Sequence, residues 1–133
     1  MHITYKGDYA LKTLLYLTRA YDMKVVSIHE IAHQGDMPIK FLEQVIGLLK
    51  RGGFVKSTRG VKGGYALAKP PEKITLGEVV RFVDGPLEPI ACVGSKSYPG
   101  CGETAQCKLR KVLCQVKKAV SGIVDNVTLK DLL

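Results

Sequence analysis

Apolar residues recur every three or four positions in the first third of the chain, and this spacing predicts helices. They are expected over residues 9–21, 28–34 and 38–51. Ser27 and Glu30 form a capping-box pattern at the start of the second helix. The other boundaries are marked by residues that typically start or stop helices: Gly35, Pro38, Gly52 and Gly53. The apolar face of the third helix comprises Leu42, Val45, Ile46 and Leu49.

Two short strands are expected next, over residues 54–58 and 65–68. Residues 59–64 join them and include three glycines, which is typical of a hairpin connection. Thr75 and Glu78 then repeat the capping-box pattern. This pattern predicts a fourth helix that ends near residue 84.

The last third of the chain combines an aperiodic segment with a long helix. Residues 86–103 have no period and are rich in glycine and proline, so we expect a long loop, a type that is usually functional or disordered. From about Thr104 we expect a helix about 30 Å long. Its apolar stripe, which needs a partner surface, comprises Leu109, Val112, Leu113, Val116, Val120 and Ile123. Thr128 and Asp131 predict a cap on a last short turn.

The composition narrows the class of protein. With 133 residues, of which 46% are hydrophobic and 24% charged, the chain is typical of one globular domain. Neither a second domain nor a dinucleotide-binding half fits easily in this length. The sequence has no apolar run of the roughly 18 residues of a membrane span, and its start does not resemble a signal peptide. We therefore expect a cytoplasmic protein with no membrane partner.

The net charge of +8 is concentrated in two segments. Residues 38–73 hold eight basic and two acidic residues, and residues 104–121 hold five basic residues and no acidic one. Such local positive fields favour a polyanionic partner. The alternative is a basic surface that is merely solvated.

The order of three helices followed by a basic hairpin is that of a winged helix-turn-helix. The third helix would enter the major groove, where Lys40, Glu43 and Gln44 would meet base edges. Arg59 and Lys62 would hold the wing on DNA, at phosphates or in the narrow minor groove. The alternative is a basic helical domain that binds another protein. We predict a mainly α fold with a small β wing that binds double-stranded DNA.

The cysteines form a second candidate site. Cys92, Cys101 and Cys107 lie in or just after the aperiodic segment, and Cys114 follows seven residues later. In a cytosolic protein such a group favours metal or redox chemistry over structural disulfides. The spacing is unlike that of a zinc ribbon or finger. An iron–sulfur cluster, a single zinc ion and a regulatory thiol–disulfide pair are all consistent with it.

His29, Glu30 and His33 match the H-E-x-x-H pattern, in which two histidines bind zinc and the glutamate acts as a base. Glu30 is already accounted for by the capping box, and the predicted helix has only two turns. The further glycine and histidine that extend this pattern in some zinc enzymes are absent. We interpret the two histidines as surface residues of the DNA-binding unit.

Several motifs resemble those of the IscR/NsrR/CymR-type family of bacterial winged-helix regulators. They are Lys6-Gly7-x-Tyr9-Ala10-Leu11, Phe41-Leu42-Glu43-Gln44, Gly53-Phe54-Val55-x-Ser57-x-Arg59-Gly60, Gly63-Gly64-Tyr65-x-Leu67 and Thr128-Leu129. The resemblance covers nearly the whole chain, and the glycine-rich wing is its most specific part. It implies a homodimer, held together by the long C-terminal helix, that binds a palindromic operator. We divide the chain into a winged helix-turn-helix unit, residues 1–73, and a cysteine-bearing loop with a dimerisation helix, residues 74–133, within one compact domain.

The resemblance also implies ligands for an iron–sulfur cluster. In cluster-bearing members three loop cysteines bind iron, and Cys92, Cys101 and Cys107 occupy those positions. IscR-like members add a histidine three residues after the third cysteine, but this chain has Arg110, which stays protonated and cannot bind iron. NsrR-like members use an aspartate of the partner subunit near the start of the first helix, and Asp8 holds that place.

Alternatives to Asp8 as the fourth ligand stay open. Asp8 is equally well explained as an acid favoured by the helix macrodipole at an N-terminus. Cys114 is a rival, although seven helical residues separate its Cα from that of Cys107 by about 10 Å; it is otherwise a free or redox-active thiol. His2 is close to Asp8 only in sequence.

We predict a homodimeric transcription regulator, not an enzyme, that senses redox state, nitric oxide or iron–sulfur status through a [2Fe–2S] or [4Fe–4S] cluster. The cluster would bridge the loop of one subunit to the first helix of the other, and its loss would shift the population of recognition-helix angles. We expect purification in air to empty the site. One alternative is a winged-helix regulator that senses through thiol–disulfide chemistry. Another, of a different class, is an iron–sulfur carrier or a small zinc hydrolase.

Overall fold

The computed structural model describes residues 2–94, 101–102 and 105–133 of the chain. Over these residues the helices are α1 (Tyr5–Arg19), α2 (Ile28–Gly35), α3 (Ile39–Arg51), α4 (Leu76–Asp84) and α5 (Lys108–Val124). The strands are β1 (Val55–Thr58) and β2 (Gly64–Leu67). Short 3₁₀ turns are η1 (Pro71–Lys73), η2 (Ala91–Val93) and η3 (Lys130–Leu132). The mainly α fold with a small β wing is confirmed.

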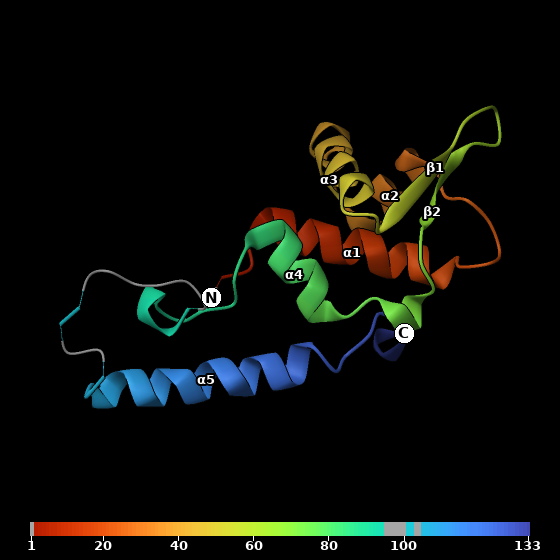
Figure 1. Ribbon diagram of the computed structural model, residues 1–133. Coiled ribbons are helices and arrows are strands. Elements are labelled where there is room, and N and C mark those ends of the chain that lie inside the picture. The colour runs from red at the N-terminus through yellow and green to blue at the C-terminus, as the bar shows by residue number, and fades with distance from the viewer. Residues whose placement is uncertain (1, 95–100, 103–104) are drawn as a thin grey trace.

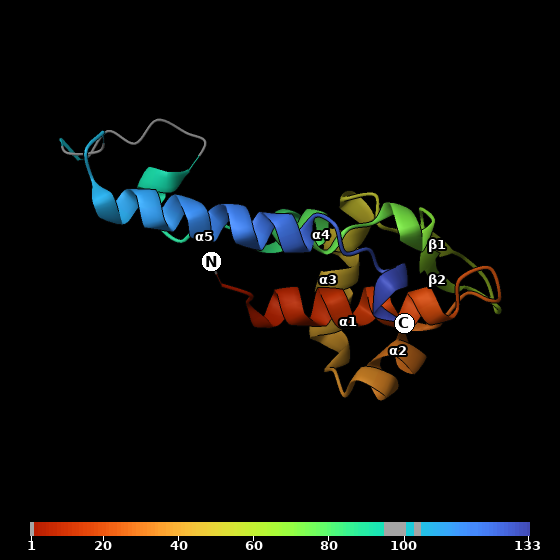
Figure 2. The same cartoon turned by 90° about the horizontal axis from the view of Figure 1, so that it is seen from below.

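Helix α1 lies at the centre of the molecule. In Figure 1, α2, α3 and the β1–β2 hairpin lie on one side of α1, and α5 lies on the other side beyond α4. The N-terminal half of α5 and η2 extend past the body formed by α1 to α4 in both views (Figures 1 and 2). The α3–hairpin region and the cysteine-bearing elements are therefore at separate parts of the molecule.

The core confirms the predicted apolar face of α3. Its residues Leu42, Val45, Ile46 and Leu49 are at most 2% exposed. They pack with buried residues of α1, α2 and α4, including Leu14, Ile31 and Val79. Leu129, close to the C-terminus, is fully buried in the same core, and its N–H donates to the carbonyl of Ile74 at 2.9 Å. The last residues of the chain thus return to the core.

The wing is an antiparallel hairpin in which Val55 pairs with Leu67 and Thr58 with Gly64. Tyr65 also exchanges two backbone hydrogen bonds with Val26, at 2.9 and 2.8 Å, so the hairpin is attached to the segment that precedes α2. At Gly64 a Cβ atom would lie 2.6 Å from the carbonyl oxygen of Val26, and therefore only glycine fits there. The expectation that the first strand begins at residue 54 was wrong, because Phe54 is buried in the turn after α3 and donates to Leu49.

Two other boundaries differ from the sequence analysis. Helix α1 begins at Tyr5 rather than at residue 9, because the Thr4 hydroxyl accepts a hydrogen bond from the Gly7 N–H and caps it there. Helix α2 ends at Gly35, and the left-handed residue that stops it is the next one, Asp36, at φ 49°. Gly35 is instead packed against the Met37 side chain, which a Cβ atom would displace.

The capping boxes are only half formed. Ser27 accepts from the Glu30 N–H and Thr75 from the Glu78 N–H, both at 3.2 Å, as expected. The two glutamate side chains, however, turn outward: Glu30 accepts from Lys24 and Glu78 accepts from Lys69. A lysine ammonium is available at both places and provides a charge-assisted bond in place of the return hydrogen bond.

The 86–103 segment and the long helix also differ from expectation. The segment contains η2, and Leu87 and Val93 are at most 6% exposed, so this part is folded rather than a simple loop. Helix α5 begins at Lys108 with Cys107 as its N-cap, not near Thr104, which lies outside the described residues. Its 17 residues span about 25 Å.

The apolar stripe of α5 divides into two faces. Leu113 and Val120 are half-buried on the side that faces η2 and α4. The other face is exposed to between 38% and 65% and comprises Leu109, Val112, Val116 and Ile123. None of the residues Lys108–Val124 is fully buried. The sequence periodicity identified the apolar positions of α5. It could not show which of them face η2 and α4 and which face solvent.

Candidate nucleic-acid interface and cysteine site

Helix α3 presents the predicted base-reading residues to solvent. Lys40, Glu43 and Gln44 are exposed, on the side opposite the four buried residues of the helix. Gly47 follows Glu43 by one turn, and a Cβ atom placed there would meet only an Arg51 Nη1 atom, at 3.9 Å. The backbone of this helix can therefore be approached closely by another molecule.

The hairpin carries Arg59 and Lys62 at its tip. Both side chains are exposed, and the tip projects away from the helical body (Figure 1). Gly60 adopts a φ of 112°, and its carbonyl accepts from the Gly63 N–H at 2.9 Å, which closes the turn. The glycines that the sequence placed around Arg59 thus shape the turn that presents it.

The positive charge of this region is uncompensated. Ion pairs in the described part of the chain join Lys12 to Asp8, Lys24 to Glu30, Lys69 to Glu78, Arg81 to Asp125 and Lys117 to Glu88. None of them includes a residue of α3 or of the hairpin. Six basic side chains there have no acidic partner among the described residues: Lys40, Lys50, Arg51, Lys56, Arg59 and Lys62. Their field is available to an external polyanion.

A groove of about 480 Å³ lies between the hairpin and the helices. Ser27 and Ile28 at the start of α2 line one wall, and Lys50 and Arg59 add positive charge to it. The N–H groups of the first turn of a helix attract anions. This groove therefore connects the wing to the helix-turn-helix with a surface suited to a phosphate backbone.

The cysteines lie at the far end of the molecule. Cys92 is in η2 and half-buried, Cys107 is the N-cap of α5, Cys101 is exposed and Cys114 is half-buried within α5. Cys92, Cys107 and Cys114 are free thiols. Within the described residues, no group of three or more histidine, cysteine or acidic side chains is close enough to hold a metal. The predicted three-cysteine set is thus not assembled in this conformation.

Arg110 connects two of the cysteine positions. Its side-chain Nε–H donates to the carbonyl of Cys92 at 2.9 Å, and its backbone N–H donates to the Cys107 Sγ at 3.4 Å. Two turns further along α5, Lys117 donates to the next carbonyl, that of Val93, at 3.1 Å. The cysteine-bearing η2 turn is thus held on α5 by two cations. Neither contact was predictable from the sequence, because a side chain that binds a backbone carbonyl leaves no sequence signature.

Asp8 lies in the first turn of α1, where its carboxylate pairs with Lys12 at 2.6 Å. The hydrogen bond from Lys12 to Asp8 raises the pKa of that lysine. Asp8 does not join the cysteines of its own chain in a metal-ligating group among the described residues. A ligand role for Asp8 therefore requires the partner subunit's copy or a different conformation.

The Glu30 carboxylate, which would be the base of an H-E-x-x-H zinc site, is held by two other side chains. It accepts from Lys24 at 2.7 Å and from the Tyr16 hydroxyl at 3.2 Å. The Lys24 hydrogen bond, with a smaller contribution from Tyr16, holds the pKa of this carboxyl below its usual value. His29 and His33 are exposed. A carboxylate held in this way is a poor general base, so the H-E-x-x-H match is structural.

No helix in the described portion is long and apolar enough to cross a membrane.

Comparisons with known proteins agree with this geometry. Residues 3–133 match the family model Rrf2, described as an iron-dependent transcriptional regulator. An rrf2-like HTH-type transcriptional regulator of Rhodobacter capsulatus is 38% identical over 137 aligned positions, which cover 98% of this chain and 91% of the relative.

Two solved structures are similar along almost the entire chain. CymR, the global cysteine regulator of Bacillus subtilis, superimposes with a TM-score of 0.83 at 30% identity over 99% of this chain and 95% of its own. IscR of T. potens gives a TM-score of 0.77 at 30% identity over 99% of this chain and 85% of its own. The winged helix-turn-helix architecture, the exposed face of α3 and the full-length matches lead to one assignment. The chain belongs to the Rrf2 family of winged-helix transcriptional regulators, which are not enzymes.

Proposed function

We propose that this protein is a homodimeric, cytoplasmic regulator that binds a palindromic operator and responds to the state of its loop cysteines. The observation that carries the DNA-binding part is the uncompensated charge of α3 and the hairpin, where six basic side chains lack acidic partners among the described residues. Lys40, Glu43 and Gln44 read bases in the major groove. Arg59 and Lys62 hold the wing on phosphates or in the minor groove.

The test of DNA binding is a salt titration on a duplex library that is selected for binding. The logarithm of the association constant should fall linearly with the logarithm of the salt concentration, with a slope of about 0.9 per phosphate contacted. Glu43→Ala and Gln44→Ala should change which sequences are preferred. An affinity that does not depend on salt, or no duplex binding at any ionic strength, would contradict the proposal.

The sensing part of the proposal rests on Cys92, Cys101 and Cys107. Their donor chemistry fits an iron–sulfur cluster, because thiolates are its usual ligands and Arg110 already holds the Cys92 and Cys107 segments at the same end of α5. When bound, a [2Fe–2S] or [4Fe–4S] cluster supplies a link that oxidation or nitric oxide can break. The partner subunit's Asp8 is the proposed fourth ligand. Its carboxylate oxygen is a harder donor than a thiolate and should bind the iron less strongly.

The experiment for this part is purification without oxygen, followed by reconstitution with iron and sulfide. Visible absorbance and iron content should show the cluster, and each of Cys92→Ser, Cys101→Ser and Cys107→Ser should abolish it. Cys114→Ser is the matched control and should leave the cluster intact. A colourless product with unimpaired DNA binding would favour the alternative, a regulator that works through thiol–disulfide chemistry.

Asp8→Asn tests the fourth ligand separately. This substitution retains the size of the side chain but removes its negative charge. The proposal predicts a less stable cluster or a different cluster type, measured by the decay of visible absorbance in air. Lys12→Gln breaks the same ion pair from the other side and should leave the cluster unchanged. Identical decay for the wild-type protein and Asp8→Asn would remove Asp8 from the ligand set.

A further inference from the structure

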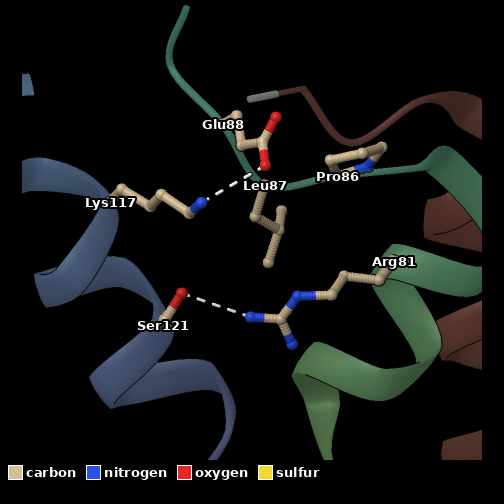
Figure 3. Close-up of a pocket in the computed structure, with 6 residues that line it drawn as sticks. All are labelled: Arg81, Pro86, Leu87, Glu88, Lys117 and Ser121. Carbon is tan, nitrogen blue, oxygen red and sulfur yellow. Dashed lines mark hydrogen bonds and ion pairs between the residues drawn. The ribbon is translucent and has the colours of Figure 1, made fainter. Parts of the chain in front are cut away.

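A cavity of about 300 Å³ lies between α4, residues 86–88 and α5. Arg81 approaches it from α4, and Lys117 and Ser121 approach it from α5 (Figure 3). Leu87 points between the two basic side chains, and Pro86 completes the apolar part of the lining. The cavity is separate from α3 and the hairpin, and it shares Lys117 with the contact that holds η2 on α5.

The polar groups around this cavity have hydrogen-bond donors that are not used among the described residues. Ser121 accepts from Arg81 at 3.2 Å, and its own hydroxyl hydrogen is not used in a hydrogen bond among the described residues. The Nε–H of Arg81 is similarly unused, since its contacts are made by the two Nη atoms. Lys117 has three donors and uses two of them, for Glu88 and the Val93 carbonyl. Three residues thus each offer a donor to an additional acceptor.

One of the existing contacts is longer than usual. The Lys117–Glu88 pair is 3.3 Å long, whereas charge-assisted hydrogen bonds are usually about 2.7–2.9 Å. Glu88 and Asp125 are the acidic groups at the site, and they balance the charges of Lys117 and Arg81. This balance favours a ligand with one negative charge over a dianion. The apolar contact that Leu87 and Pro86 provide favours a ligand with a short hydrocarbon part.

We propose that this cavity binds a small organic monocarboxylate. The carboxylate accepts hydrogen bonds from Lys117, Ser121 and Arg81, and the hydrocarbon part lies on Leu87. Because α4 packs on α1 and α5 carries the exposed apolar face, the ligand joins the DNA-binding body to the long helix. Ligand binding at this site requires neither DNA nor a cluster. Its test is therefore independent of the test of the proposed function.

The test is a titration of the full-length protein with sodium butyrate at constant ionic strength, followed by methyl and amide NMR. The Leu87 methyl and Ser121 amide signals should shift along saturable curves with dissociation constants in the millimolar range. Acetate should bind more weakly than butyrate, because it has less hydrocarbon to cover Leu87. Succinate and sulfate, as dianions, should bind more weakly than butyrate.

Variants make the test specific to this cavity. Lys117→Gln and Ser121→Ala should each weaken butyrate binding roughly three- to tenfold, the loss expected for one typical hydrogen bond. Lys118→Gln, an exposed neighbour on α5, should bind butyrate as the wild type does. Ser121→Ala is small enough to preserve the fold even if Lys117→Gln does not. Shifts that fail to saturate, or an unchanged affinity in Ser121→Ala, would overturn the proposal.

Discussion

Two threonines on α1 show how a buried hydroxyl can either stabilise or destabilise the same helix. Thr13 and Thr18 are 0% and 3% exposed. The Thr18 hydroxyl donates to the Leu14 carbonyl at 2.7 Å, whereas the Thr13 hydroxyl has no hydrogen-bond partner among the described residues. A buried polar group without a partner carries the cost of its lost hydration.

Replacing each threonine with valine should therefore have opposite effects. Thr13→Val removes an unsatisfied hydroxyl and keeps the side-chain shape, so we expect the free energy of unfolding to rise by about 1 kcal/mol. Thr18→Val loses a made hydrogen bond and should lower it by about 1 kcal/mol. Urea denaturation of both variants measures the difference. Equal destabilisation by the two substitutions would show that the Thr13 hydroxyl is satisfied in solution.

Arg110 is a second residue whose role was invisible in the sequence. The sequence shows that Arg110 replaces a histidine of the family. Its contact with the Cys92 carbonyl could not be predicted, because it depends on how η2 folds back on α5. We expect Arg110→Ala to increase the rate of Cys92 alkylation in the metal-free protein roughly fivefold, the factor for about 1 kcal/mol of lost hydrogen bonding. Peptide mass spectrometry with Cys101 as the internal reference measures it. Lys111→Ala, exposed on the same helix, is the control.

At the scale of elements, helices with strong local signals were predictable and those without were not. Ser27 and Thr75 cap α2 and α4 where the sequence placed them, because a hydroxyl N-cap depends only on nearby residues. The start of α5 was wrong because its N-cap is Cys107, a residue type that rarely caps. Helix η2 was missed because it is held by contacts with α5, a distant part of the chain.

The end of α5 should be sensitive to acid. Arg81 on α4 binds both oxygens of Asp125, the residue that follows α5, and this contact holds the pKa of the Asp125 carboxyl below its ordinary value. A depressed pKa means that the contact stabilises the folded protein fully above the ordinary value of about 3.9. That stabilisation is lost as the pH falls through the lower, folded-state pKa.

Hydrogen exchange at the C-terminal end of α5 can follow this loss. We expect protection there to decrease below about pH 4, ahead of the protection of α3. Asp125→Asn should show the weaker protection already at neutral pH and little further change on acidification. If the wild type and Asp125→Asn have the same pH profile, the Arg81 contact does not attach α5 to α4 in solution.

At the scale of the whole molecule, the chain leaves one apolar surface without a neighbour. Leu109, Val112, Val116 and Ile123 lie along one face of α5 and are exposed to between 38% and 65%. The sequence predicted that this helix needs a partner surface, but it could not separate this face from the half-buried Leu113 and Val120. That separation depends on which side of α5 meets η2 and α4.

The proposed homodimer would cover this face. Val116→Arg places a charge in the middle of it and should convert the dimer to a monomer, because burying an unpaired charge is costly. Sedimentation equilibrium measures the change in mass. Lys118→Glu alters the charge of an adjacent exposed position and should preserve the dimer. A wild-type protein that is monomeric at high concentration would leave the exposed face unexplained.

The weak attachment of α5 has a consequence for how much of the protein a cell must make. Without a fully buried residue in Lys108–Val124, one chain alone gives this helix few of the contacts that hold a long helix in a fixed direction. The contacts of Arg81, Arg110 and Lys117 attach α5 to its own chain, and a second chain would add the apolar contacts that fix its direction. Operator occupancy should therefore rise with roughly the square of the subunit concentration when subunits are scarce, so that abundance acts as an input beside any chemical signal.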